Sequence, residues 1–252
     1  MTAGDDQTIA EMTGKARTAY RRMAAASDAE KANGLTHAAH ALRAHAPQIA
    51  AANDRDMAAG EQAGLSSAML DRLRLDADRI EGMASAIEQV AALADPVGEI
   101  IDSRARPNGL VMERVRVPVG VLGIIYESRP NVTADAAALG LRSGNAVILR
   151  GGSEAVHSNR AIHAAIVEGM NAAGLPADAV QLVHTQDRAA VGAANHGHRR
   201  CDLCFQRGER GAAMRVLRLS GEPAPLRAPA AAARAARGTR RRSLGGISVY
   251  TP

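Results

Sequence analysis

The fold of this chain is decided by residues 117–155, which read VPVGVLGIIYESRPNVTADAAALGLRSGNAVILRGGSEA. Apolar side chains cluster at 121–125 and again at 146–149, and both clusters have the length of buried strands. Between them, the segment from Thr133 to Gly144 predicts a helix. Strands that alternate with amphipathic helices through short Gly, Asn or Pro turns are typical of parallel βαβ units. The stretch therefore predicts an α/β protein with an open, doubly wound parallel sheet.

Flanking segments extend this pattern in both directions. Residues 153–174 predict a second amphipathic helix, and residues 180–183 predict a third short strand. Residues 1–97 predict helices, because their apolar side chains recur every three or four positions. One helix is expected to begin at Ser27 or Asp28 and to run toward Asn53, and another to begin at Ser66 or Ser67. Their apolar stripes need a partner surface, so we interpret them as scaffold packing.

Two further regions have a different character. Residues 98–117 alternate apolar and polar side chains around the turn Pro107, Asn108, Gly109, which predicts a hairpin arm. Residues 195–252 are rich in Arg, Ala and Pro and predict disorder, because they lack a pattern that buries a core, apart from a short apolar segment at 203–205. We therefore expect three parts: helices at 1–97, an α/β part at 98–194 that includes the arm, and the tail at 195–252.

The charge of the chain bears on its partners and location. The formal net charge is +5, and the excess lies in residues 195–252. A basic tail attracts phosphates in a salt-dependent way, but only Phe205 and Tyr250 offer base stacking there, so we do not expect nucleic acid as a partner. No apolar run reaches the roughly eighteen residues of a membrane span, and the polar start MTAGDDQTIAEM does not resemble a secretory signal. A cytoplasmic protein is expected.

The tail also carries a possible metal-ligand set. His196, His198, Cys201 and Cys204 form an H-x-H-x2-C-x2-C spacing that suits tetrahedral zinc. A structural zinc site more often draws on two separated ligand pairs, so we favour chance spacing and expect no metal. The two cysteines are too few and too close in sequence for a disulfide framework.

Candidate binding residues follow the first two predicted strands. In open α/β sheets, ligands bind beyond the carboxyl ends of the strands, where helix N-termini present free N–H groups. Residues 126–131 follow the first strand, and Arg150, Gly151, Gly152, Ser153 and Glu154 follow the second. The glycines permit close approach of a phosphate or ribose, and Arg150 can pair with a phosphate. The alternative is a plain strand-to-helix turn; neither G-x-G-x-x-G nor G-x-x-x-x-G-K-[ST] is present to decide between them.

Four blocks of the sequence carry a family resemblance. They are MLDRLRLDADRI (69–80), DPVGEI (95–100), the stretch from RPNGLV to GGSEA (106–155) and SNRAI (158–162). Together they resemble the γ-glutamyl phosphate reductases, also called glutamate-5-semialdehyde dehydrogenases, of the aldehyde dehydrogenase superfamily. YESRPNVT and GNAVILRGGSEA are the most specific blocks, and the resemblance covers about the first 190 residues.

The resemblance implies an oxidoreductase of proline biosynthesis that reduces L-glutamyl 5-phosphate to glutamate 5-semialdehyde with NADPH. A cysteine thiolate attacks the acyl phosphate, and the resulting thioester accepts the hydride. By matching motif, the resemblance implies an NADPH site within residues 98–194. This site comprises Arg150, Ser153 and Glu154, with Gly151 and Gly152. Arg129 and Asn131 lie near the substrate and its developing oxyanion. The family also implies self-association through the hairpin arm.

The resemblance stops before the family's nucleophile. That cysteine belongs to a second α/β domain further downstream, and neither Cys201 nor Cys204 stands in a matching motif, so no catalytic residue is assigned. From about Gly192 the family pattern gives way to Arg, Ala, Gly and Pro, for which a reading-frame shift is our leading explanation. We therefore expect an incomplete cofactor domain without the catalytic domain, and a truncated form with little or no reductase turnover. The alternative is a nucleotide-binding fragment whose tail binds nucleic acid or zinc.

Overall fold

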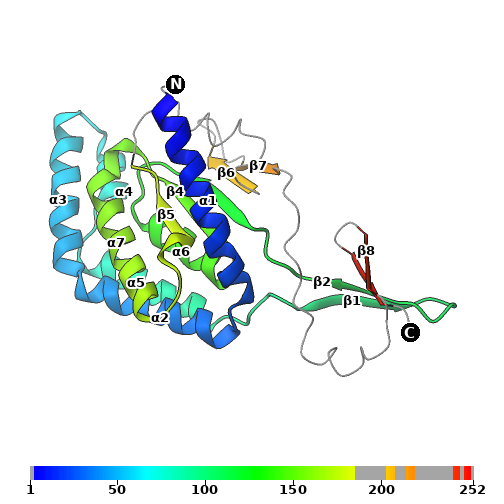
Figure 1. Cartoon of the computed structure of the whole chain (residues 1–252). Helices are drawn as coiled ribbons and strands as arrows, with labels where there is room; N and C mark the ends of the chain where they lie inside the picture. The colour runs from blue at the N-terminus through cyan, green and yellow to red at the C-terminus, as the bar shows by residue number, and fades with distance from the viewer. Residues whose placement is uncertain (1–2, 185–202, 208–213, 219–240, 245–246, 251–252) are drawn as a thin grey trace. The chain divides into compact units, whose positions relative to one another are not determined.

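The computed structural model describes residues 3–184, 203–207, 214–218, 241–244 and 247–250 (Figure 1). The chain folds into two compact units. One comprises Met1–Leu93 and Val119–Gly221, and the other comprises Ala94–Pro118 and Glu222–Pro252. The candidate binding residues all lie in the first unit.

The first unit begins with five helices: α1 (Ala3–Ala25), α2 (Asp28–Ala44), α3 (Ala46–Gln62), α4 (Ser67–Leu73) and α5 (Ala77–Ala92). Ser27 caps α2 as predicted, because its hydroxyl accepts from the Glu30 N–H at 3.2 Å while the Glu30 carboxylate accepts from the Ser27 N–H at 2.7 Å. This backbone hydrogen bond, together with the nearby Arg22, lowers the pKa of Glu30 to about 2. Ser66 is the N-cap position of α4, as expected.

One predicted helix is two helices in the structure. The segment expected to run from residue 27 or 28 toward Asn53 is interrupted at His45, where α2 ends and α3 begins. Pro47 lies in the first turn of α3 and lacks the N–H that a continuous helix needs at that position. The chain therefore changes direction here, and α3 follows a separate path.

The core of the first unit is a five-stranded sheet with the order β5-β4-β3-β6-β7. Its strands are β3 (Val121–Ile125), β4 (Ala146–Arg150), β5 (Val180–Leu182), β6 (Leu203–Arg207) and β7 (Met214–Arg218). All neighbours pair in parallel except β6 and β7, which are antiparallel. Helix α6 (Asn131–Arg142) connects β3 to β4, and α7 (Val156–Ala172), preceded by the short turn η1 (Ser153–Ala155), connects β4 to η2 (Ala177–Ala179) and β5. The predicted α/β fold with a parallel sheet is confirmed.

Helices cover both faces of this sheet. Val147 on β4 lies against Gly140 of α6, so this side chain marks the face that α6 covers. Gln181 on β5 pairs with Ile148, the residue after Val147, and therefore points to the opposite face. Its side-chain amide donates to the Met12 carbonyl of α1 at 2.9 Å. Helix α1 thus covers the face opposite α6, as a doubly wound sheet requires.

The N-terminal helices and the sheet share one hydrophobic core. Leu42 of α2, Ile87 of α5, Leu149 of β4 and Ile166 of α7 all belong to it and are nearly inaccessible to solvent. The sequence predicts a boundary near residue 97, between a helical part and an α/β part. In the structure, the segments before and after the hairpin, Met1–Leu93 and Val119–Gly221, belong to the same unit.

The second unit contains a four-stranded sheet of order β1-β2-β9-β8. Its strands are β1 (Ile100–Ala105), β2 (Val111–Val115), β8 (Arg241–Leu244) and β9 (Ile247–Tyr250). The hairpin of β1 and β2 closes through Arg106, whose N–H donates to the Leu110 carbonyl at 2.8 Å, and Gly109 adopts a positive φ of 82°. The turn therefore lies where the sequence predicts it.

Four strands, β6 to β9, lie within residues 195–252, for which the sequence predicts disorder. Strand β6 begins at Leu203, in the one short apolar segment of that region, and pairs with β3. The other residues of the tail lie outside the described part of the chain. This also holds for His196, His198 and Cys201 of the zinc spacing, and for the side chain of Cys204.

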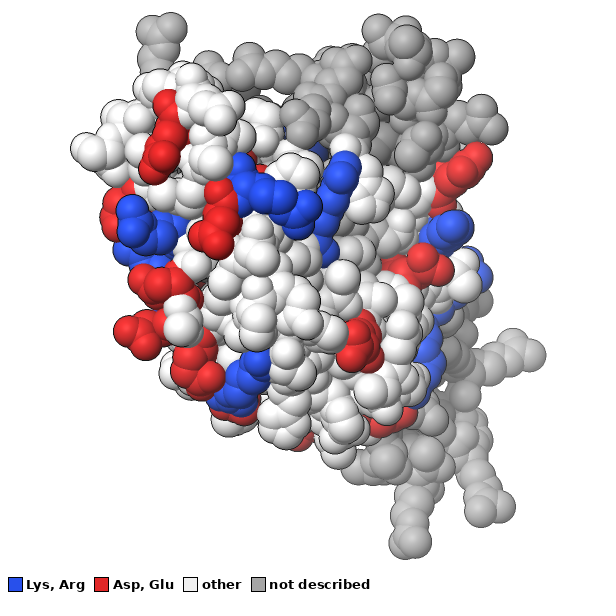
Figure 2. Space-filling model, turned by 90° about the vertical axis from the view of Figure 1, so that its left-hand side faces the viewer, with Lys and Arg blue, Asp and Glu red and all other residues white. Residues whose placement is uncertain are grey.

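Searches of the described residues give two further results. None of their helices is long and apolar enough to cross a membrane. They also contain no group of three or more His, Cys, Asp or Glu side chains arranged to hold a metal ion. On the face shown in Figure 2, the described residues carry acidic and basic side chains beside one another, so the charges there are of mixed sign.

Candidate functional site

The loops that follow β3 and β4 lie side by side. The Tyr126 N–H, just after β3, donates to the carbonyl of Arg150 at the end of β4, at 3.1 Å. A Cβ atom on Gly152 would lie 3.3 Å from the Cα atom of Glu127 and 3.4 Å from the backbone nitrogen of Ser128. A side chain at this position would therefore press the two loops apart. The predicted loop ends thus form one continuous backbone surface.

Gly151 is held even more closely. A Cβ atom at this position would lie 2.1 Å from Nδ2 of Asn159 and 3.2 Å from Cε2 of Tyr126. Any other residue would displace Asn159, which is 3% exposed and cannot move into solvent freely. Glycine is therefore required by space at both positions.

A buried polar chain fixes these loops to the helices behind them. The Thr133 hydroxyl on α6 donates to Oδ1 of Asn159 on α7 at 3.0 Å, and it lies 2.7 Å from the Tyr126 hydroxyl. Since the Thr133 proton is used toward Asn159, Tyr126 donates to Thr133. Burial raises the pKa of Tyr126 to about 12, so the phenol keeps its proton at neutral pH. One chain of hydrogen bonds therefore links the end of β3, α6 and α7.

A small pocket opens at the carboxyl ends of β4 and β5. It is lined by Gly151, Gly152, Val156, Asn159, Arg160, Leu182, Val183 and His184. Leu182 is buried, whereas Arg160 and His184 are exposed. The pocket thus combines an apolar base, two glycines, of which Gly151 is half-buried and Gly152 buried, and two basic side chains. This combination suits an anionic ligand with an apolar or aromatic part.

The candidate residues from the sequence occupy different places around this pocket. Gly151 and Gly152 line it, and Arg150 and Glu154, both half-buried, lie on either side of them in sequence. Ser153 is exposed at the start of η1.

Arg129 and Asn131 lie on the other loop end. Arg129 is exposed in the loop after β3. Asn131 is the first residue of α6, and its amide donates to Asp135 on the same helix at 3.1 Å. Burial raises the pKa of Asp135.

The order of the strands makes this second loop a special position. Strand β3 lies between β4 and β6. From β3 the chain continues to β4 and β5 on one side of it, and β6 and β7 then follow on the other side. The crevice at such a reversal, beyond the carboxyl ends of the strands, is where open α/β sheets bind ligands. The loop with Arg129 therefore lies at the topological switch point of the sheet.

Several residues at the pocket and behind its loops were not identified from the sequence. Arg160 and His184 line the pocket, and Asn159 and Thr133 hold its loops. Asp56 lies on α3 and binds the first turn of α7, about one hundred residues further along the chain. The sequence offers one signal for these contacts: two polar residues, Ser158 and Asn159, stand on the side of α7 that otherwise packs inward.

Comparison with known proteins agrees with this arrangement. The aldehyde dehydrogenase family model matches residues 1–227. The chain is 65% identical over 208 residues to the γ-glutamyl phosphate reductase of Sphingopyxis alaskensis, which covers 82% of this chain and 48% of that protein. The chain is also 51% identical over 224 residues to the protein of the same name from Paramagnetospirillum magneticum. This match covers 88% of this chain and 53% of that protein. The chain thus spans about half the length of these relatives.

Solved structures show the same relationship. The crystal structure of γ-glutamyl phosphate reductase from Thermotoga maritima superposes with a TM-score of 0.75 at 39% identity, covering 80% of this chain and 49% of that one. The protein of the same name from Saccharomyces cerevisiae superposes with a TM-score of 0.67 at 36% identity, covering 70% of this chain and 46% of that one. The resemblance found in the sequence motifs is confirmed. With a family model that matches most of its length and a sheet of the same fold, this chain belongs to the aldehyde dehydrogenase family.

Proposed function

We propose that the described part of the chain binds NADPH, as the cofactor-binding part of an oxidoreductase that reduces L-glutamyl 5-phosphate to glutamate 5-semialdehyde. The observation that carries this proposal is the meeting of the two loop ends at Gly151 and Gly152, beside a pocket with basic side chains. Both glycines lie where a Cβ atom would collide with neighbouring atoms, so this turn, and with it the wall of the pocket, depends on glycine at 151 and 152. The nicotinamide cofactor supplies a hydride when bound.

The cofactor residues divide into two groups by their chemistry. Arg150 can pair bidentately with a phosphate, and the oxygens of Ser153 and Glu154 can bond to ribose hydroxyls. Arg160 and His184 lie at the pocket, where Arg160 can pair with the 2′-phosphate that distinguishes NADPH from NADH. Leu182 and Val183 provide the apolar surface on which an adenine ring can lie.

The substrate residues lie on the loop after β3. We propose that the exposed guanidinium of Arg129 binds an anionic group of the substrate, either its phosphate or its carboxylate. Asn131 uses one amide proton toward Asp135, which orients its side chain and leaves the second proton for the developing oxyanion. The switch-point location of this loop supports both roles.

The reductase reaction also needs a thiolate nucleophile. The resemblance assigns this role to neither Cys201 nor Cys204, since neither stands in a matching motif. We therefore assign cofactor and substrate binding, rather than turnover, to the described residues.

Titration of the full chain with NADPH and with NADH, followed by the fluorescence of the reduced nicotinamide, tests the proposal. We expect saturable binding of NADPH. Gly151→Ala should weaken it by about tenfold or more, because the added methyl group displaces Asn159. Gly82→Ala is the matched control, since a Cβ atom there meets nothing within 4 Å. Arg160→Ala should weaken NADPH by about tenfold and leave NADH unchanged. Folded wild-type chain that binds neither dinucleotide would refute the proposal.

A further inference from the structure

A row of three side chains runs along the solvent-facing side of α6. Asn131, Asp135 and Leu139 are spaced by four residues and therefore lie on one side of the helix. Asn131 and Asp135 are half-buried, and Leu139 is apolar and 55% exposed. The other charged residue of α6, Arg142, pairs with Asp28. Asp135 is therefore the one charged group in this row, directly beside the proposed oxyanion residue.

This carboxylate has no cation beside it in the part of the chain that the structure describes. Its one side-chain partner there is the amide of Asn131, which donates to Oδ2 at 3.1 Å, so Oδ1 accepts from no described donor. Burial raises the pKa of Asp135, and the Asn131 amide offsets this effect only in part. A positively charged group next to Asp135 would therefore stabilise the charged carboxylate.

The proposed substrate carries one such group. L-Glutamyl 5-phosphate has an α-ammonium group, and four bonds separate its nitrogen from the C5 carbonyl carbon. In an extended chain these bonds span about 5 Å. Residues four positions apart on a helix are separated by a rise of about 6 Å, which is a similar distance. A substrate whose C5 oxygen is bound by the amide of Asn131 thus has its ammonium group within reach of Oδ1 of Asp135.

We propose that Asp135 binds the α-ammonium group of the glutamyl substrate. It is then a specificity-determining residue, because it selects acyl phosphates of an amino acid over those that lack the amino group. This inference rests on the proposed function, which places the C5 oxygen at Asn131. The alternative is that Asp135 only orients Asn131 through their hydrogen bond.

Two stable analogues separate these roles in calorimetric titrations of the full chain. One is L-glutamyl 5-phosphate with a methylene group in place of the oxygen that bridges carbon and phosphorus, and the other is the same compound without its α-amino group. The wild type should bind the amino compound about tenfold more tightly, because a hydrogen bond between charged groups is gained. Asp135→Asn should bind both compounds equally, and as tightly as the wild type binds the compound without the amino group. Asn keeps an oxygen that can accept from Asn131, so a role in orientation alone would leave the tenfold preference intact.

Two controls identify the carboxylate that is responsible. Asp54→Asn removes the same charge from an exposed position on α3 and should keep the preference. Glu127→Gln removes the exposed carboxylate of the loop after β3 and should also keep it. Loss of the preference in Glu127→Gln but not in Asp135→Asn would place the ammonium group at the loop and overturn the inference.

A second measurement needs no variant and decides the question if Asp135→Asn does not fold. In ¹³C-labelled wild type, the carboxyl-carbon NMR signal of Asp135 should shift in a saturable way with the amino compound and much less with the compound that lacks the amino group. Equal binding of the two compounds by the wild type would overturn the inference and leave the proposed function standing. Binding of neither compound would remove the proposed substrate site together with this inference, while the NADPH titration would still decide the cofactor site.

Discussion

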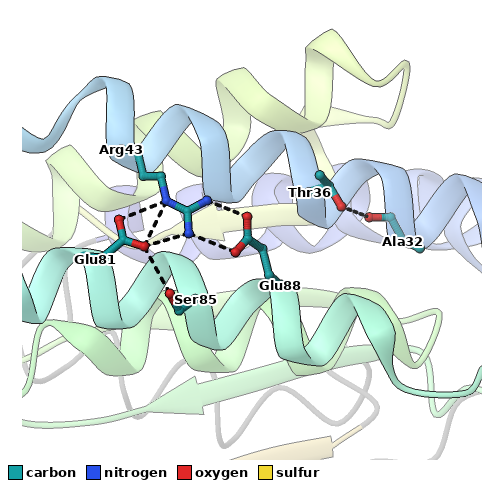
Figure 3. A network of polar contacts seen from close by, with 6 residues as sticks. All are labelled: Ala32, Thr36, Arg43, Glu81, Ser85 and Glu88. Atoms are coloured by element: carbon teal, nitrogen blue, oxygen red, sulfur yellow. Dashed lines mark hydrogen bonds and ion pairs between the residues drawn. The ribbon is translucent and has the colours of Figure 1, made fainter.

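Arg43 on α2 joins two carboxylates of α5 (Figure 3). Its guanidinium lies 2.7 Å from Glu81 and 2.5 Å from Glu88, and Glu81 also accepts from the Ser85 hydroxyl at 3.1 Å. The hydrogen bonds from Arg43 lower the pKa of both carboxyl groups. Since the side chains of Arg43, Glu81 and Glu88 are 32%, 53% and 37% exposed, solvent screens the attraction, and we expect a modest effect on stability.

Replacement of Arg43 by Gln should raise the pKa of Glu81 and of Glu88 toward the ordinary value, because the donor that favours the charged form is lost. A lowered carboxyl pKa stabilises the fold above the ordinary value of 4.5 and ceases to do so as the pH falls through the lowered value. The stability difference between wild type and variant should therefore be present at neutral pH and vanish in acid. Carboxyl-carbon NMR titration and urea unfolding at several pH values measure both effects.

Arg55→Gln provides the control for this prediction. It removes an equal charge from an exposed position on α3 and should leave the pKa of Glu81 and of Glu88 unchanged. Unaltered pKa values in Arg43→Gln would show that the contacts between α2 and α5 do not persist in solution.

Individual site residues differ in how far the sequence predicts them. Gly151 and Gly152 were identified, because a turn between a buried strand and a helix is a local pattern. Asp56 and Asn159 were not, since their partners depend on how α3 and α7 meet. No periodicity in the sequence encodes that meeting. The assigned roles of Arg129 and Asn131 stay predictions.

Helices α2 and α7 approach each other closely at a glycine. A Cβ atom on Gly169 would lie 2.5 Å from the Cα and nitrogen atoms of Ala38 and from the carbonyl oxygen of His37. These are backbone atoms, which cannot rotate away as the end of a side chain does. The crossing of the two helices therefore depends on the absence of a side chain at this position.

Gly169→Ala should destabilise the protein by about 1–3 kcal/mol, because the helices must separate to admit the methyl group. Gly82→Ala on α5 is the matched change in open space, and it should stabilise by about 0.5–1 kcal/mol through helix propensity alone. Urea unfolding followed by circular dichroism gives both free energies. Equal effects of the two substitutions would mean that α2 and α7 do not pack at the described distance.

The elements themselves are predicted well where their signal is local. Strands β3, β4 and β5 and helices α6 and α7 follow the expected apolar pattern to within a few residues, and the β1–β2 turn lies at the expected Pro107, Asn108 and Gly109. The division between α2 and α3 was missed, because Pro47 was not weighed against the helical periodicity around it. The place of β6 beside β3 was also missed, since strand order is set by contacts between segments far apart in the chain.

A buried cation connects helices that the sequence would assign to different parts of the chain. Arg142 at the end of α6 has a side chain that is 5% exposed, and it pairs with Asp28 at the start of α2 at 2.5 Å. It also donates to the carbonyl of Leu93, just after α5, at 3.0 Å. A buried guanidinium needs such partners, because an unpaired charge in the interior is strongly unfavourable. Helices from both sides of the hairpin are thus joined by polar contacts as well as by the apolar core.

Shared packing of this kind predicts cooperative unfolding of the first unit. In native-state hydrogen exchange, the most protected amides of α2 near Leu42, of β4 near Leu149 and of α7 near Ile166 should open with the same free energy, within about 1 kcal/mol, and with the same dependence on denaturant. The reason is that removing α2 exposes the core face of α7, so neither helix is stable without the other. Amides of α2 that open at distinctly lower free energy would instead support an independent helical part that ends near residue 97. Arg142→Met, which keeps the volume of the side chain but removes its hydrogen bonds, should lower the common free energy of all three elements together rather than that of α6 alone.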